Sequence, residues 1–173
     1  MLQKLTFVLG GAASGKSRWA EKLLLSSRLD PVYLATARVL DSEINLKIGL
    51  HKKRRSARWT NYEADLELNG VLHGLKPTQA VLIDCATMWL SNHMLDDRDV
   101  TLAQKSLLAA MKACPAPIVI VSNEVGHGIV PQNALARAFR EAQGRLNIAL
   151  AEQSDLAVLV TAGLPLALKG ELP

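Results

Sequence analysis

The sequence predicts an α/β protein of one domain, with a mainly parallel sheet and helices on both of its faces. Apolar runs of strand length recur along the chain, helical stretches separate them, and no repeat or linker divides the 173 residues, so the predicted domain is 1–173. Hydrophobic residues make up 49% and charged residues 21%, a balance that excludes long disorder. A chain of this length can bury a full hydrophobic core.

Five apolar runs are expected as strands. They are near-continuous rather than alternating, which is typical of strands buried on both faces of a parallel sheet. Residues 59–63 are a candidate for a further short strand. The five runs cover residues 5–9, 32–35, 81–83, 118–121 and 156–160.

Helical patterns lie between these runs, at roughly residues 16–27, 66–75, 87–95, 102–113 and 133–153. Asp41 and Ser42 are plausible N-caps of one more helix, which would reach about Arg54. The alternation implies right-handed βαβ units. Ligands of such sheets bind beyond the carboxyl ends of the strands, so the residues just after each apolar run are the first candidates for a site.

A phosphate-binding motif follows the first apolar run. It fits G-x-x-x-x-G-K-[ST] and consists of Gly10, Gly11, Ala12, Ala13, Ser14, Gly15, Lys16 and Ser17. The glycines let successive backbone N–H groups point at phosphate oxygens. Lys16 would reach the β- and γ-phosphates of a nucleotide, and the Ser17 hydroxyl would ligate Mg²⁺. The alternative is an ordinary glycine-rich turn, but the strand before the motif and the helix after it favour a P-loop NTPase-like fold.

Two acids end apolar strands in the manner of site residues. Asp84 follows residues 80–83 and would project into the crevice, where it could bind the metal or the nucleotide. It could instead cap the helix that follows. Glu124 ends the next strand in the same way, although an exposed carboxylate at a strand end is common.

The positive charge of the chain is concentrated around one histidine, His51. The net charge is +4, and the six positive residues between positions 47 and 58 exceed it, so the remainder is slightly acidic. These residues are Lys47, Lys52, Lys53, Arg54, Arg55 and Arg58. A solvated helix face, a nucleic-acid patch and a phosphate-binding cluster all remain open on this evidence. In the third case nearby cations would keep His51 neutral, and its free lone pair could attack phosphorus.

The remaining histidines and the cysteines carry weaker signals. His73 and His93 have no metal partner at a usual spacing and are interpreted as structural, whereas His127 lies between two glycines in a loop that could contact substrate. Cys85 and Cys114 exclude a disulfide framework and do not support a zinc site. The first apolar run is too short for a signal peptide, and no 18 apolar residues run together. A cytoplasmic protein without a membrane span is therefore expected.

Three segments together resemble one family, the bifunctional adenosylcobinamide kinase/adenosylcobinamide-phosphate guanylyltransferases of cobalamin biosynthesis. They are the phosphate loop, residues 51–59 (His-Lys-Lys-Arg-Arg leading to Trp59), and residues 123–131 (Asn-Glu-Val-Gly-His-Gly-Ile-Val-Pro). Residues 84–92, 135–140 and 144–147 match as well, so the resemblance runs from about residue 5 to 169. The phosphate loop is shared by many families, and the other two segments are far more specific.

The resemblance implies two reactions. The γ-phosphate of ATP or GTP is transferred to adenosylcobinamide, and GMP from GTP then passes through a guanylylated histidine, His51, to give adenosylcobinamide-GDP. It also implies Mg²⁺, a homotrimer and no nucleic-acid partner. The implied nucleotide contacts are residues 10–17, Ala35, Thr36, Ala37, Lys52, Lys53, Arg54, Arg55, Glu63 and Asp84, and Glu124 and His127 are candidates for the substrate loop.

Two positions depart from the family pattern. Ala13 stands where family members commonly have Arg, and Ser56 stands where they usually have Pro after the arginine that corresponds to Arg55. Neither change removes a group that the chemistry requires. The alternatives are a P-loop small-molecule kinase that leaves His51 idle, and a regulatory NTPase that binds nucleic acid through the basic segment.

Overall fold

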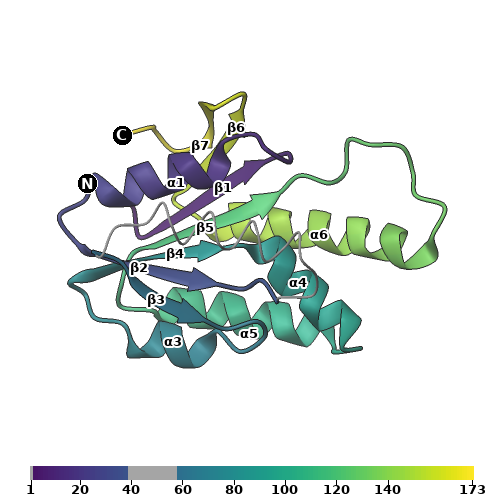
Figure 1. The fold of residues 1–173 in the computed structure, drawn as a ribbon, viewed down its shortest axis with the longest axis horizontal. Coiled ribbons are helices and arrows are strands. Elements are labelled where there is room, and N and C mark those ends of the chain that lie inside the picture. Colours follow the sequence, from purple (N-terminus) through teal and green to yellow (C-terminus); the bar gives the residue numbers. More distant parts are fainter. Residues whose placement is uncertain (1, 39–57) are drawn as a thin grey trace.

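The seven strands form one sheet in the order β3-β2-β4-β5-β1-β6-β7, in a computed structural model that describes residues 2–38 and 58–173 (Figure 1). All neighbouring strands pair in parallel except β6 and β7, which form an antiparallel hairpin. The strands are β1 (Leu5–Gly10), β2 (Asp30–Ala35), β3 (Thr60–Glu63), β4 (Gln79–Asp84), β5 (Ile118–Asn123), β6 (Leu156–Thr161) and β7 (Leu164–Lys169).

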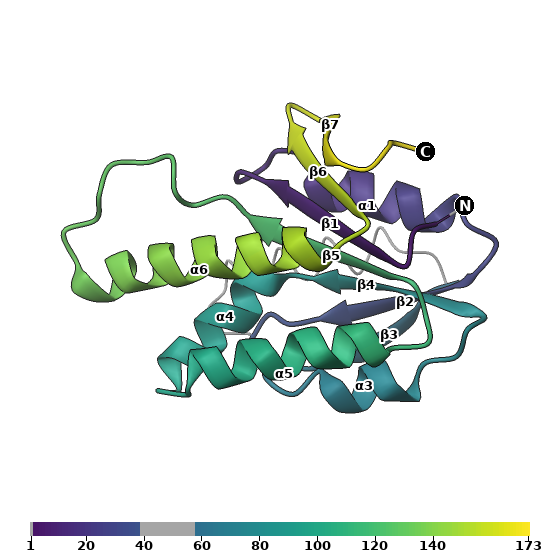
Figure 2. The same cartoon turned by 180° about the vertical axis from the view of Figure 1, so that it is seen from behind.

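Helices cover both faces of the sheet (Figures 1 and 2). The first helix packs on one face through Leu23 and Leu24, together with Val8 and Leu82 of the sheet. The other described helices lie on the opposite face. The helices are α1 (Lys16–Leu25), α3 (Asn69–Gly74), α4 (Ala86–Leu95), α5 (Val100–Ala113) and α6 (Ala134–Gln153).

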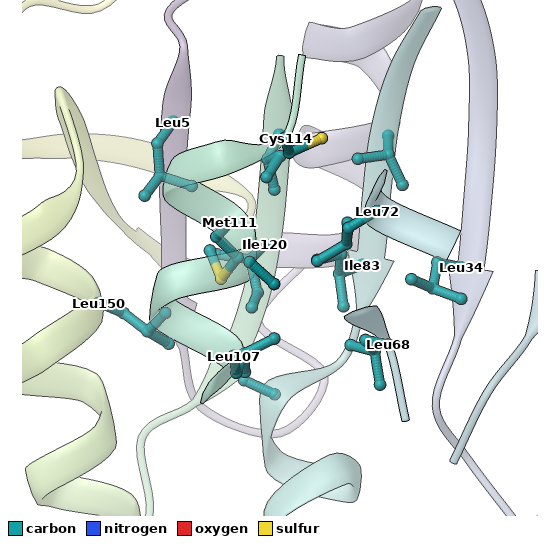
Figure 3. Packing of buried hydrophobic residues seen from close by; sticks show 14 of the residues in the cluster. Leu5, Leu34, Leu68, Leu72, Ile83, Leu107, Met111, Cys114, Ile120 and Leu150 are labelled. Carbon is teal, nitrogen blue, oxygen red and sulfur yellow. The ribbon is translucent and has the colours of Figure 1, made fainter. Parts of the chain in front are cut away.

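The alternation of side chains along each strand explains why the apolar runs are continuous. In β1, Phe7 points into the core under α3 to α6, whereas Val8 points into the core under α1, and both are at most 1% exposed. Figure 3 shows the first of these cores, where Ile83 and Ile120 of the sheet face Leu107 and other side chains of the helices. Both faces of the central strands therefore exclude water, as the sequence predicts for a covered parallel sheet.

The predicted elements are confirmed wherever the chain is described, with one strand missed. The short strand at 59–63 is present as β3, and the helix predicted at 66–75 is shorter, at Asn69–Gly74. The missed strand, β7, is exposed at alternate positions, including Leu164 and Leu166, and contains Pro165. A proline in a short run argues against a central strand, but it is compatible with this edge position. The helix predicted from Asp41 to Arg54 lies outside the described residues.

Candidate active site

The parallel register brings the predicted site residues to one edge of the sheet. Ala35, the last residue of β2, pairs with Glu63 of β3 on one side and with Asp84 of β4 on the other. Gly10, the last residue of β1, pairs with Asn123 of β5. The carboxyl ends of these five strands therefore lie side by side, and the loops that follow them share the edge where ligands of α/β sheets bind.

The phosphate loop joins this edge to the first helix. Gly15 is the N-cap of α1 and has φ +91°, a left-handed conformation that strains any residue with a Cβ atom. The backbone N–H of Gly163, in the turn between β6 and β7, donates to the carbonyl of Ser14 at 2.8 Å. The hairpin that ends the sheet thus holds the middle of the loop in place.

The start of the loop lies too close to β6 to admit a side chain. A Cβ atom built on Gly10 would lie 2.6 Å from the carbonyl oxygen of Val160, and it would also overlap Ser14. Gly10 is therefore required by a close approach of two backbones. The first two residues of the motif differ in this respect, because a Cβ atom on Gly11 would meet nothing within 4 Å.

Lys16 lies at the start of α1 and folds back over the loop. Its Nζ donates to the carbonyl of Gly11 at 3.0 Å. Burial lowers the pKa of Lys16, and the charge of Asp84 acts in the opposite direction. Burial and the charge of Asp84 raise the pKa of the Cys85 thiol to about 11, so Cys85 is protonated at neutral pH. Asp84 is then the group that balances the ammonium of Lys16.

Asp84 does not cap the helix that follows it. The N-cap of α4 is Cys85, and it makes no side-chain cap hydrogen bond. The Asp84 carboxylate instead accepts a hydrogen bond from the Tyr33 hydroxyl at 2.8 Å, and Tyr33 packs edge-on against Trp59 with ring centroids 6.1 Å apart. The interpretation of Asp84 as a helix cap is therefore wrong, and its side chain is oriented from β2.

Oxygen donors suited to Mg²⁺ are available next to the phosphate loop. Ser17 offers a hydroxyl and Asp84 a carboxylate, and Mg²⁺ prefers such ligands, usually one or two from the protein with the remainder from phosphates and water. Within residues 2–38 and 58–173, no cluster of three or more His, Cys, Asp or Glu side chains could hold a metal ion.

Residues 35–37 are held against the junction of β4 and α4. The buried Thr36 hydroxyl donates to the carbonyl of Cys85 at 2.7 Å and accepts from its backbone N–H at 2.8 Å. The side-chain amide of Asn92 donates to the carbonyl of Thr36 at 2.8 Å. Glu63 lies exposed at the end of β3. These contacts fix the backbone of Thr36 at the edge where β3 ends.

Sequence reasoning missed an arginine next to this segment. Arg38 forms a bidentate pair with Asp96 at 2.7 and 2.8 Å, and its Nε donates to Asp65. The hydrogen bonds to Arg38 lower the pKa of both carboxyls, and the bond to Asp96, followed by that to Asp65, raises the pKa of Arg38. The three residues follow β2, β3 and α4, so no local pattern could have joined them.

The loop after β5 carries the two weaker candidates. Glu124 turns back on its own loop, because its carboxylate accepts from the backbone N–H of Gly126, and its backbone N–H donates to the carbonyl of Gly10 at 3.1 Å. His127 is exposed. Arg140 of α6 donates to the carbonyl of Gly126, and Arg137 donates to that of Pro131 at 2.9 Å. Helix α6 thus holds both ends of the loop.

A buried polar network supports the end of β5, and sequence reasoning missed it as well. The Ser122 hydroxyl donates to the side-chain carbonyl of Asn147 at 2.7 Å, and Gln143 donates to both at 2.9 Å. Asn147 donates in turn to the carbonyl of Asn123 at 3.2 Å, and the Thr87 hydroxyl accepts from the N–H of Asn123 at 2.8 Å. Isolated polar residues in α6 give no signal of such a network before the fold is known.

The basic segment lies largely outside the described residues. His51, Lys52, Lys53, Arg54 and Arg55 all belong to positions 39–57, so their predicted roles stay predictions.

The two histidines interpreted as structural, His73 and His93, lie within the described residues. His73 is exposed in the last turn of α3. His93 is buried, with its ring 4.5 Å from that of Trp89 and its Nε2 3.3 Å from the carbonyl of Leu66.

Comparison with known proteins supports the resemblance seen in the sequence. A family model described as cobinamide kinase / cobinamide phosphate guanyltransferase matches residues 6–168. Bifunctional adenosylcobalamin biosynthesis protein CobP of Pseudomonas aeruginosa is 40% identical over 167 residues, which cover 95% of this chain and 96% of the relative. The CobU proteins of Escherichia coli and Salmonella typhimurium are each 36% identical over 181 residues, covering 95% of this chain and 99% of the relative.

Solved structures that resemble this chain confirm the predicted fold class. The flagellar accessory protein FlaH from Methanocaldococcus jannaschii has a TM-score of 0.53 at 13% identity. The match covers 99% of this chain and 80% of the FlaH chain. An ATPase from the type III secretion system of pathogenic bacteria has a TM-score of 0.54 at 10% identity. The match covers 96% of this chain and 57% of the ATPase chain. At these identities the likeness concerns the P-loop NTPase-like fold alone. None of the described helices is long and apolar enough to cross a membrane.

Proposed function

This chain belongs to the cobinamide kinase / cobinamide phosphate guanyltransferase family, and on that premise we propose that it catalyses both reactions of the family. It phosphorylates adenosylcobinamide with ATP or GTP, and it then transfers GMP from GTP to the phosphorylated product. The observation that carries the proposal is the phosphate loop at the carboxyl edge of the sheet, where the Nζ of Lys16 folds back onto the carbonyl of Gly11 and the charge of Asp84 raises the pKa of Lys16. We further propose a cytoplasmic homotrimer that binds no nucleic acid.

The first reaction rests on positioning and on neutralising charge. The backbone N–H groups of residues 10–17 would cradle the phosphates, and the ammonium of Lys16 would reach the β- and γ-phosphates. Ser17 and Asp84 would hold Mg²⁺, which when bound neutralises charge on the phosphate oxygens. Ala35, Thr36, Ala37 and Glu63 complete the proposed nucleotide contacts.

The second reaction replaces one difficult displacement by two easier ones. The neutral imidazole of His51 attacks the α-phosphorus of GTP, an N–P bond forms, and pyrophosphate leaves as its bond to that phosphorus breaks. A phosphate oxygen of adenosylcobinamide phosphate then attacks the same phosphorus and releases the imidazole. Lys52, Lys53, Arg54 and Arg55 would neutralise the phosphates around His51, and Glu124 and His127 are the proposed contacts to the cobinamide substrate.

Labelled nucleotides test the two reactions separately. The whole chain is incubated with Mg²⁺ and GTP labelled at the α-phosphate, and the protein is assayed for an adduct that is labile to acid and stable to alkali. We expect the adduct in the wild type and in His73→Ala, a control at an exposed helix end, and we expect none in His51→Ala.

A second arm follows transfer of γ-labelled phosphate to adenosylcobinamide. The wild type and His51→Ala should both catalyse it, whereas Lys16→Met should not. Phosphate transfer without any protein adduct would reduce the chain to a kinase with one activity. The absence of both reactions in the wild type would overturn the proposal as a whole.

A further inference from the structure

An apolar groove lies between helices α4 and α6. It encloses about 280 Å³, and none of its lining residues is charged. Two of the apolar lining residues are open to solvent, with Leu95 exposed at 53% and Leu135 at 52%. The groove is lined by Ser91, Met94, Leu95, Asn133, Leu135, Ala136 and Phe139.

The groove lies on the side of the sheet where the chemistry is proposed. Helix α4 starts at Ala86, two residues after Asp84, and continues beyond the carboxyl ends of the strands (Figures 1 and 2). The loop after β5 runs outward on the same side and leads into the first turn of α6 (Figures 1 and 2). A molecule seated in the groove is therefore next to the edge that carries the phosphate loop.

The walls of the groove have the rigidity that a binding site needs. Met94 and Phe139 are partly buried and pack against the hydrophobic core, so they form its floor. Asn133 caps α6, because its side-chain oxygen accepts from the N–H groups of Leu135 at 2.8 Å and Ala136 at 3.2 Å. The cap fixes the turn that carries Leu135. Apolar groups continue into the preceding loop, where Ile129 is exposed at 97% and Val130 at 66%.

Cobinamide has the chemistry that such a surface recognises. Its corrin ring carries methyl groups and uncharged carboxamide chains, so an edge of the ring can enter an apolar, uncharged groove without burying a charge. At about 280 Å³ the groove is slightly smaller than common ligand pockets, which measure about 300–1,000 Å³, so it would take one edge of the ring and not the whole ligand. The rest of the ring would lie over the rim and over the exposed apolar loop.

We propose that the groove between α4 and α6 binds the corrin edge of the cobinamide substrate. This inference rests on the proposed function, since it names where the acceptor of that reaction docks. The phosphate loop and Lys16 then bind the nucleotide, while an uncharged surface on the other side of the edge orients the acceptor. Leu135 and Leu95 contribute affinity for the acceptor and none for the nucleotide.

The test introduces a charge into the groove and measures binding of adenosylcobinamide by equilibrium dialysis, read from the visible absorbance of the corrin. Leu135→Glu should raise the Kd about tenfold or more, because the carboxylate would have to be desolvated against an apolar ring edge. Ala136→Phe, which fills the groove without a charge, should weaken binding as well. The Kd for GTP should change less than about twofold in both variants.

The matched control lies on the same helix. Ile148 is 61% exposed and lies about 20 Å further along the axis, outside the groove, so Ile148→Glu should leave the Kd for adenosylcobinamide unchanged. Light scattering reports the mass of each variant, since an exposed apolar groove could also be covered by a second copy of the chain.

An unchanged Kd in Leu135→Glu, with the wild type active, would overturn the groove assignment and leave the proposed function intact. A lower mass in Leu135→Glu would also overturn it, because the groove would then be a contact between copies. A wild type that neither binds nor phosphorylates adenosylcobinamide would refute the proposed function itself.

Discussion

Two adjacent glycines of the phosphate loop should respond in opposite ways to the same small change. Gly10→Ala adds a Cβ atom 2.6 Å from the carbonyl oxygen of Val160, which belongs to the backbone of β6 and cannot rotate away. Gly11→Ala adds a Cβ atom with nothing within 4 Å, and Gly11 is not among the described glycines with positive φ. Only the first substitution should perturb the fold.

The size of the effect follows from the overlap. Ordinary contacts of a Cβ atom start at 3.4 Å, so β6 or the loop would have to move by about 0.8 Å. Overpacking of this kind costs about 2 kcal/mol of unfolding free energy. With a urea m-value of about 2 kcal/mol/M, the midpoint of Gly10→Ala should fall by about 1 M. Gly11→Ala should stay within about 0.5 kcal/mol of the wild type.

Urea unfolding followed by circular dichroism measures both variants without nucleotide. Leaving the nucleotide out matters, because a ligand that binds only the folded state would add its own stabilisation. Equal midpoints for the two variants would refute the close approach of the Gly10 backbone to β6. A larger loss in Gly11→Ala than in Gly10→Ala would refute it as well.

Three further substitutions probe the charges and polar groups around the site. Lys16→Met should lower phosphoryl transfer about 100-fold or more and should stabilise the nucleotide-free protein at pH 7, since burial opposes the charge on Lys16. That gain in unfolding free energy should shrink as pH rises through the lowered pKa of Lys16 toward 10.5, where the lysine is neutral in both states. Arg38→Ala should destabilise the protein at pH 7, and its deficit should shrink as pH falls below 3.8 and through the lowered pKa of its partners Asp65 and Asp96, because the two ion pairs are lost there. A deficit that is equal at pH 7 and at pH 2 would contradict this. Asn147→Ala removes the acceptor of the buried Ser122 hydroxyl and should cost about 1–3 kcal/mol in urea unfolding, against no more than about 0.5 kcal/mol for the exposed control Arg145→Ala.

The parts of the fold that follow from local patterns were predictable from the sequence. Continuous apolar runs are a local property, and the strands that they predict pair in parallel with helices on both faces. The phosphate loop is equally local, because its motif lies within eight residues and needs only a strand before it and a helix after it. Asp84 is predicted as a site residue because it directly follows an apolar run, and the structure places it at the carboxyl end of β4.

The contacts that orient the site could not be predicted, because they join distant parts of the chain. Tyr33 donates to Asp84 across 51 positions, and Arg38 reaches Asp96 across 58. Asp84 is not the cap of α4, and its carboxylate accepts a hydrogen bond from Tyr33, which the residues around Asp84 in the sequence do not indicate. The strand β7 escaped prediction for a different reason, since an exposed edge strand with a proline lacks the apolar continuity of the central strands.

The hairpin of β6 and β7, whose second strand was not predicted, contacts the phosphate loop, whose motif was the strongest signal in the sequence. The motif predicts which residues would contact phosphate, but a loop of eight residues with three glycines has much conformational freedom of its own. Part of that freedom is removed by the turn between β6 and β7, where Gly163 donates to Ser14 and would lie 3.0 Å from a Cβ atom on Gly15. Strand β1, which leads into the loop, pairs with β5 on one side and with β6 on the other. The loop and the hairpin that contacts it are therefore both attached to the same sheet. The loop is therefore ordered before nucleotide binds, and less binding energy is spent on ordering it.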